Sequence, residues 1–115
     1  MLTVETADRV TILAPTIDRL DAANAAAFRL QVDAHLALGS RVLLDLEKIQ
    51  FLDSTGLGVI LGIFRQLKGS GGELRLCRPG PHVQTLFRMV RLGSKIPVHA
   101  DRTEALAAFA APPAA

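Results

Sequence analysis

The segment RVLLDLEKIQFLDSTGLGVILGIFRQLKG, residues 41–69, decides how this chain folds. Its first part, residues 41–49, is an apolar run that carries the acid Asp45. Such a run is typical of a strand buried on both faces, as in a parallel sheet covered by helices. Its last part, residues 57–69, predicts a helix. The octapeptide FLDSTGLG, residues 51–58, joins the two and includes two glycines, each of which disfavours a helix by roughly 1 kcal/mol relative to alanine.

The rest of the chain predicts further strands and helices on both sides of this segment. The expected elements are strands over 2–6 and 9–14, a loop over 15–20, a helix over 21–38, a strand over 73–78, a helix from about His82, a short strand over 95–100 and a helix over 101–110. Asp21 is the expected N-cap of the first helix, and Gly39 its left-handed C-terminal residue. Pro97 favours a sheet edge or the end of a strand. Asp101 and Glu104 resemble a capping box.

This order, ββαβαβαβα, predicts one α/β domain. Alternation of strands and helices after a hairpin favours a mixed sheet of four to five strands flanked by about four helices. We expect the domain to span residues 1–110 and residues 111–115 to form a frayed tail. The length suits one domain with one core, and no linker divides it.

Composition excludes several classes of function. The net charge is +2, the basic residues are scattered, and five Phe are the only aromatics, which argues against nucleic-acid binding. The single cysteine, Cys77, rules out a disulfide within the chain and predicts a buried thiol. The N-terminus does not resemble a signal peptide, and no apolar run is long enough to span a bilayer. We therefore expect a cytoplasmic protein that does not insert into membranes.

The junction does not match the sequence patterns of nucleotide-binding loops or of hydrolases. DSTGLG lacks both GxxxxGK[ST] and GxGxxG, and Ser54 does not lie in a GxSxG elbow. The histidines, His35, His82 and His99, have no spacing that assigns one as a base, and no HxxxH or CxxC pair indicates a metal site. No cofactor is expected, and an enzymatic function is the least favoured interpretation.

Hydroxyl and glycine residues at a helix start have two physical uses. Asp53, Ser54 and Thr55 are all good capping residues, and one of them caps the predicted helix. Gly58 and Gly62 lie four apart on one helix face, where a bare strip permits close approach by the chain's own sheet or by a partner. The fold should tolerate a phosphate on Ser54, because the helix dipole and the free amides favour an anion there. The same phosphate would add roughly two negative charges to any interface formed at this position.

The segment LLDLEKIQFLDSTGLGVILGIFRQLKGSGGELRLC, together with DRLDAANAAAF and VQTLFRMVRLG, resembles the STAS domains of bacterial anti-sigma factor antagonists. The resemblance covers nearly the whole chain and implies a β-sheet flanked by helices. It also implies a phosphorylation switch. The unphosphorylated domain would bind an anti-sigma factor with serine kinase activity, which phosphorylates the domain and is then released. A PP2C-type phosphatase would reset it, so the chain is a kinase substrate and not an enzyme.

The resemblance also assigns roles to residues. Ser54 is the phosphoacceptor, Asp53 shapes the loop and its recognition by the kinase, and Thr55 is a second hydroxyl. Leu57 joins the partner-binding residues, and Gly56 and Gly58 let the partner backbone approach. Asp21 matches the family aspartate that caps the first helix beside the phosphoacceptor loop.

This sequence differs from the family pattern in the loop before the first helix. Asp18 stands where the family has glycine, and Pro15 stiffens the loop, so its path near Ser54 is expected to differ. A second function stays open, that of a constitutive STAS subunit of a membrane transport complex. The sequence also leaves open the oligomeric state, with a monomer as one option, and the identity of the kinase, the phosphatase and the sigma factor.

Overall fold

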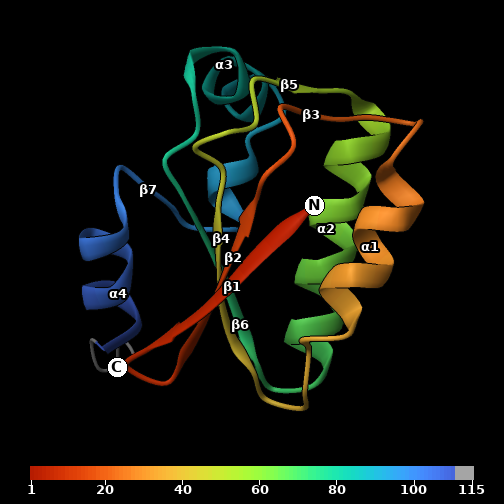
Figure 1. Cartoon of the computed structure of the whole chain (residues 1–115). Helices are drawn as coiled ribbons and strands as arrows, with labels where there is room; N and C mark the ends of the chain where they lie inside the picture. Colours follow the sequence, from red (N-terminus) through yellow and green to blue (C-terminus); the bar gives the residue numbers. More distant parts are fainter. Residues whose placement is uncertain (111–115) are drawn as a thin grey trace.

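The computed structural model describes residues 1–110 as a mixed sheet with helices on both faces (Figure 1). The sheet order is β1-β2-β4-β6-β7, with only the β1–β2 pair antiparallel. These strands span β1 Leu2–Ala7, β2 Val10–Pro15, β4 Arg41–Asp45, β6 Glu73–Cys77 and β7 Val98–His99. The predicted mixed α/β architecture is confirmed. The expected frayed tail, 111–115, lies outside the described residues.

The helices are α1 Ala25–Asp33, α2 Ser54–Gly69, α3 Pro81–Met89 and α4 Arg102–Ala110, with a short 3₁₀ turn at Leu92–Ser94. In Figure 1, α1 and α2 lie on one side of the sheet and α4 on the other. Successive residues of β4 point to opposite faces of the sheet. Val42 and Leu44 join the core that includes residues of α1, α2 and α3, whereas Leu43 joins a smaller cluster under α4. The continuous apolar run therefore reflects burial on both faces, as predicted.

Two strands of two residues each were not predicted. β3, Arg19–Leu20, pairs in parallel with β5, Phe51–Leu52, although residues 15–20 were expected to form a loop. The carbonyl oxygen of Asp18 accepts hydrogen bonds from the amides of Gln50 at 2.7 Å and Phe51 at 3.2 Å, which extends this pairing. Asp18 is not among the residues with positive φ, so it fits this position without left-handed strain. The small sheet joins the loop before α1 to the segment that leads into α2.

The first helix is shorter than expected, and Asp21 is not its N-cap. The chain makes turns over residues 21–24, in which the Asp21 carbonyl accepts from the Ala25 amide at 2.9 Å. Asn24 holds the N-cap position without capping, because its side chain reaches back to the Asp21 amide and the Arg19 carbonyl. At the other end α1 stops at Asp33.

The residues expected to complete this helix lie outside it. Leu38, the last residue of the helix predicted over 21–38, is 91% exposed, and Leu30 within α1 is 73% exposed. Gly39 has the expected positive φ of 73°, but it lies in the turn before β4 and does not end the helix. Because Leu30 and Leu38 are exposed, the buried apolar face of this helix is smaller than the sequence predicted.

The remaining expectations for the chain's ends and edges hold in part, because the strand expected over 95–100 is only Val98–His99, and one of the two hydrogen bonds of the expected capping box is found among residues 1–110. The hairpin turn is Asp8–Arg9, one residue later than predicted, because both residues take the positive φ that a two-residue turn between twisted strands requires. β7 is an edge strand next to Pro97, as expected. The Asp101 carboxylate accepts from the Glu104 amide at 2.8 Å. The Glu104 carboxylate lies 3.4 Å from His99. Cys77 is buried, which raises the pKa of its thiol to about 12.

Candidate functional site

The octapeptide singled out by the sequence forms the end of β5 and the first turn of α2. The helix begins at Ser54, three residues earlier than predicted, because Asp53 is its N-cap. One carboxylate oxygen of Asp53 accepts from the Gly56 amide at 2.8 Å and the other from the Ala22 amide at 3.1 Å. Asp53 therefore caps α2 and ties it to the loop before α1. The hydrogen bond from Gly56 is the main reason that the pKa of Asp53 lies below its usual value.

Ser54 is the first residue of α2, and both it and Thr55 are exposed. Because Asp53 is the cap, the Ser54 hydroxyl is not needed for that task. Free amides and the positive end of the helix dipole lie at this position, and both favour an anionic group. The local structure thus presents an accessible hydroxyl where an added phosphate is electrostatically tolerated.

The other residues assigned to the site divide between core and surface. Gly58 is exposed, and a Cβ there would meet nothing within 4 Å. Leu57 is only 9% exposed and packs in the core. Gly56 is buried, and a Cβ there would clash with the Leu20 carbonyl oxygen. The expectation that Gly56 admits a partner backbone is therefore wrong, since the chain's own β3 occupies that space.

The glycine strip on α2 is likewise only partly open. A Cβ at Gly62 would meet the guanidinium of Arg29 from α1, so Gly62 accommodates a neighbouring helix and not the sheet. Asp21 does not cap α1, but it adjoins Ala22, the residue whose amide bonds to Asp53. Its own carboxylate accepts from the Ala23 amide at 3.0 Å and lies 3.6 Å from Arg19.

Phe51 lies beside this site and was missed by the sequence analysis. Its ring is stacked on His82 of α3, with centroids 5.6 Å apart and planes at 16°, and the Arg19 guanidinium lies 5.1 Å from the Phe51 centroid. Phe51 is 38% exposed. The sequence carried no clear signal for it, since Phe51 and Leu52 are both apolar and only the pairing of β5 with β3 leaves Phe51 exposed and Leu52 buried.

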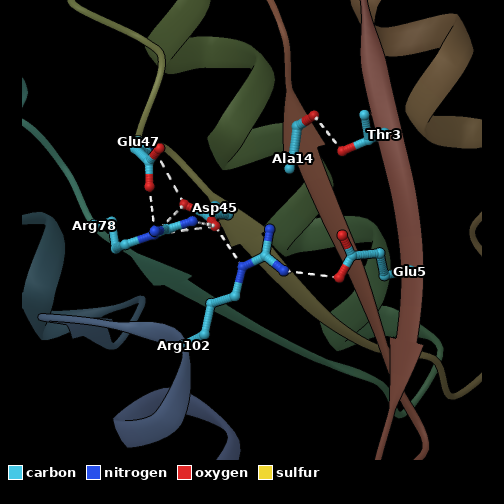
Figure 2. Close-up of polar contacts among 7 residues, drawn as sticks. All are labelled: Thr3, Glu5, Ala14, Asp45, Glu47, Arg78 and Arg102. Atoms are coloured by element: carbon cyan, nitrogen blue, oxygen red, sulfur yellow. Dashed lines mark hydrogen bonds and ion pairs between the residues drawn. The ribbon is translucent and has the colours of Figure 1, made fainter.

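A second polar cluster lies on the α4 face of the sheet (Figure 2). Asp45, at the end of β4, has a side chain that is 1% exposed and is hydrogen-bonded by Arg78 at 2.5–3.2 Å and by Arg102 at 2.6 Å. Arg78 also pairs with Glu47, and Arg102 with Glu5 at 2.8 Å. Burial alone would raise the pKa of Asp45, but these hydrogen bonds and one from the Glu47 amide outweigh burial and lower it. This cluster joins four distant parts of the chain.

The described residues also bear on the alternatives that the sequence analysis weighed. Within residues 1–110, no three His, Cys, Asp or Glu side chains gather in a way that could hold a metal ion. In the same range, no helix combines the length and apolar character needed to cross a membrane.

The assignment of the N-cap leads to a first prediction. Replacing Asp53 with alanine should lower the thermal midpoint, because the Gly56 and Ala22 amides lose their acceptor. Ser54→Ala is the matched control and should leave the midpoint unchanged, since it removes no capping bond. Thermal denaturation followed by circular dichroism compares them. Equal losses in the two variants would mean that Ser54 shares the capping role.

Comparison with known proteins agrees with this architecture. The model of the STAS domain family matches residues 1–105. BtrV of Bordetella bronchiseptica is 37% identical over 91 residues, which cover 78% of each chain. The anti-sigma F factor antagonist of Paenibacillus polymyxa is 38% identical over 65 residues, 56% of each chain.

Solved structures show the same fold. The anti-sigma factor antagonist SpoIIAA in its unphosphorylated form superposes with a TM-score of 0.76 at 23% identity, covering 99% of this chain and 100% of that one. SpoIIAA has also been solved in its phosphorylated form, which superposes with a TM-score of 0.70. The family match, the sequence relatives and the fold coincide, and this chain therefore belongs to the STAS domain family.

Proposed function

We propose that this chain is an anti-sigma factor antagonist whose binding to its partner is switched by phosphorylation of Ser54. The observation that carries the proposal is the exposed Ser54 hydroxyl at the start of α2, which Asp53 leaves free by capping the helix. Two comparisons support it: a relative that is named an anti-sigma F factor antagonist, and a fold neighbour solved in unphosphorylated and phosphorylated forms.

The unphosphorylated domain binds an anti-sigma factor that has serine kinase activity. The contact surface centres on Ser54 and includes the exposed Thr55 and Gly58, with Asp21 and Asp53 beside them. Leu57 contributes mainly by holding the first turn against the core. Gly58 matters because its missing side chain leaves open space on this face of the helix.

Phosphorylation separates the two proteins by electrostatics. A phosphate on Ser54 adds roughly 1.5 to 2 negative charges next to Asp53, and desolvating them without a cation opposes binding. The fold itself tolerates the phosphate, because the helix N-terminus favours an anion. The nucleotide belongs to the kinase, so this chain acts as a substrate in the cytoplasm, and a PP2C-type phosphatase restores the binding form.

A charge mimic at Ser54 tests the switch. Ser54→Asp should weaken binding to the cognate kinase by roughly 100-fold, because a carboxylate that is desolvated at the interface without a cation opposes association. Ser54→Ala should bind at least as tightly as wild type and stay bound in the presence of ATP. Thr103→Asp is the matched control, because it adds the same charge at an exposed hydroxyl residue in the first turn of α4, on the other side of the sheet from α2, and it should leave binding unchanged. Calorimetric titration against the purified kinase measures all three.

Phosphosite mapping on the protein recovered from its native cell comes before this titration. Phosphatase-sensitive phosphate on Ser54 would justify the search for the kinase, by cross-linking the Ser54→Ala variant in cells. Persistent absence of phosphate across growth and stress conditions would contradict the proposal. It would favour the constitutive transport subunit, in which Ser54 is structural.

A further inference from the structure

A groove beside α3 is lined by none of the residues assigned to the Ser54 site. It has a volume of about 320 Å³ and lies between α3, the 3₁₀ turn and β7. Phe87, Val98 and Pro79 give it an apolar lining, and Arg88 and Arg91 also line it. A second cavity of about 310 Å³ shares Pro79 and Val98 and continues to His99. Together they match the size of sites that hold small molecules.

The two arginines of this groove have no acidic partner among residues 1–110. The arginines that form ion pairs in that range are Arg19, Arg29, Arg75, Arg78 and Arg102, each with a carboxylate. Among the described residues, no acidic side chain lines this groove, and Arg88 contacts the Thr85 hydroxyl at 3.3 Å. Arg88, near the end of α3, and Arg91, three residues later, are therefore exposed arginines that line an apolar groove, and neither pairs with a carboxylate of residues 1–110.

The backbone conformation of Arg91 is an independent indication that its side chain has a functional role. Within residues 1–110, four non-glycine residues have positive φ: Asp8 and Arg9 form the hairpin turn, and the others are Arg78 at 54° and Arg91 at 55°. Glycine is the usual residue for this conformation at the end of a helix. Arg78 is explained by the pair that it forms with the buried Asp45 (Figure 2). Arg91 adopts the same strained conformation and has no carboxylate partner in the described chain.

We propose that this groove binds a small amphipathic anion, with an apolar body over Phe87 and Val98 and a carboxylate or phosphate held by Arg88 and Arg91. A guanidinium matches either head group through paired N–H donors, and each such bond is stronger beside an apolar surface. The site is separate from the switch at Ser54, so it stands whether or not the proposed function does.

Four small molecules test the proposal, each titrated into the isotopically labelled full chain at concentrations below the point where it forms micelles or exceeds its solubility. Decanoate and decyl phosphate carry the tail and the two head groups, decanol carries the tail alone, and acetate carries the charge alone. Decanoate or decyl phosphate should shift the amide signals of α3 and β7 with a submillimolar Kd. Decanol and acetate should bind at least tenfold more weakly. The stronger of the two anions identifies the head group.

Arg91→Gly separates binding from folding, because the two should change in opposite directions. Glycine relieves the left-handed strain, so the thermal midpoint should rise or hold, while affinity for the anion falls by roughly tenfold or more. Arg9→Gly is the matched control, since it also replaces an exposed left-handed arginine with glycine but lies in the hairpin turn. It should leave affinity unchanged.

Several results would overturn the proposal. They are the absence of shifts in α3 and β7 up to millimolar ligand, binding of decanol as tight as that of the anions, and unchanged affinity in Arg91→Gly. A matching loss of affinity in Arg9→Gly would also count against it, because it would mean that overall charge and not the groove attracts the anion.

Discussion

Replacing Asp45 with alanine is expected to lower the free energy of unfolding by about 2–3 kcal/mol. The variant removes the buried acceptor that the Arg78 and Arg102 guanidinium groups share at the end of β4, while these partly exposed arginines keep their contacts with Glu47 and Glu5. A loss of this size is a substantial share of the roughly 5–15 kcal/mol that stabilises a typical domain. Urea denaturation at pH 7 measures the loss. Glu47→Gln is the control, since Glu47 pairs with the same Arg78 but is 51% exposed, and its loss should stay below about 1 kcal/mol.

The same cluster predicts how stability depends on pH. The folded-state pKa of Asp45 lies below its usual value of 3.8, so the unfolded chain binds more protons in acid. The contribution of Asp45 is fully present above pH about 5 and is lost as pH falls through the folded pKa. Because Asp53 also has a lowered pKa, wild type alone does not isolate Asp45. Asp45→Asn should flatten the acid limb of a stability curve from pH 3 to 7. An unchanged limb would mean that folding does not shift the pKa of Asp45.

Replacing Gly56 with alanine is expected to lower the free energy of unfolding by about 2–3 kcal/mol. The added Cβ would clash with the Leu20 carbonyl oxygen and lie 2.7 Å from Leu52 Cδ1. The obstacle includes backbone, which moves less easily than the end of a flexible side chain, so overpacking at this point is costly. The clash also separates β3 from β5, the small sheet that positions Asp53 beside Ala22. Thermal and urea denaturation measure the loss.

Gly58→Ala is the matched control two residues further along the same helix. Its Cβ meets open space, and alanine is the better helix former, so this variant should gain about 0.5–1 kcal/mol. Opposite signs at the two glycines would support the division of the motif into a core half and a surface half. If both substitutions stabilised the fold, the close approach of Leu20 to Gly56 would be wrong. Gly58→Ala also tests the proposed interface, because the added methyl group should weaken partner binding without harming the fold.

The sequence was most informative where one local pattern settled the outcome. The apolar run before Asp45 predicted a strand buried on both faces, and β4 is central in the sheet with both of its faces covered. Pro97 likewise precedes an edge strand, and the Asp101 carboxylate accepts a hydrogen bond from the Glu104 amide, as the sequence predicted. These features depend on the residues themselves and their near neighbours, so periodicity and propensity were sufficient.

Patterns were less reliable where several residues compete for one task. Asp21, Asn24 and Asp53 are all residues that favour an N-cap, and only Asp53 caps a helix among them. Asn24 is diverted because its side chain is better satisfied by the Asp21 amide and the Arg19 carbonyl. Which residue caps is decided by the path of the loop, and that path depends on the pairing of β3 with the distant β5.

By itself the sequence determined the order of the helices and of the five strands of the main sheet, the buried central strand and the hydroxyl-bearing turn, because each depends on a pattern of consecutive residues. Only the tertiary structure decided that Gly56 makes room for the chain's own β3, that Asp45 is neutralised by Arg78 and Arg102, and that Arg91 accompanies an apolar groove. Arg102 lies 57 residues from Asp45, and Leu20 lies far from Gly56 in the chain. Such contacts depend on how the sheet brings distant segments together, and no local pattern carries that information.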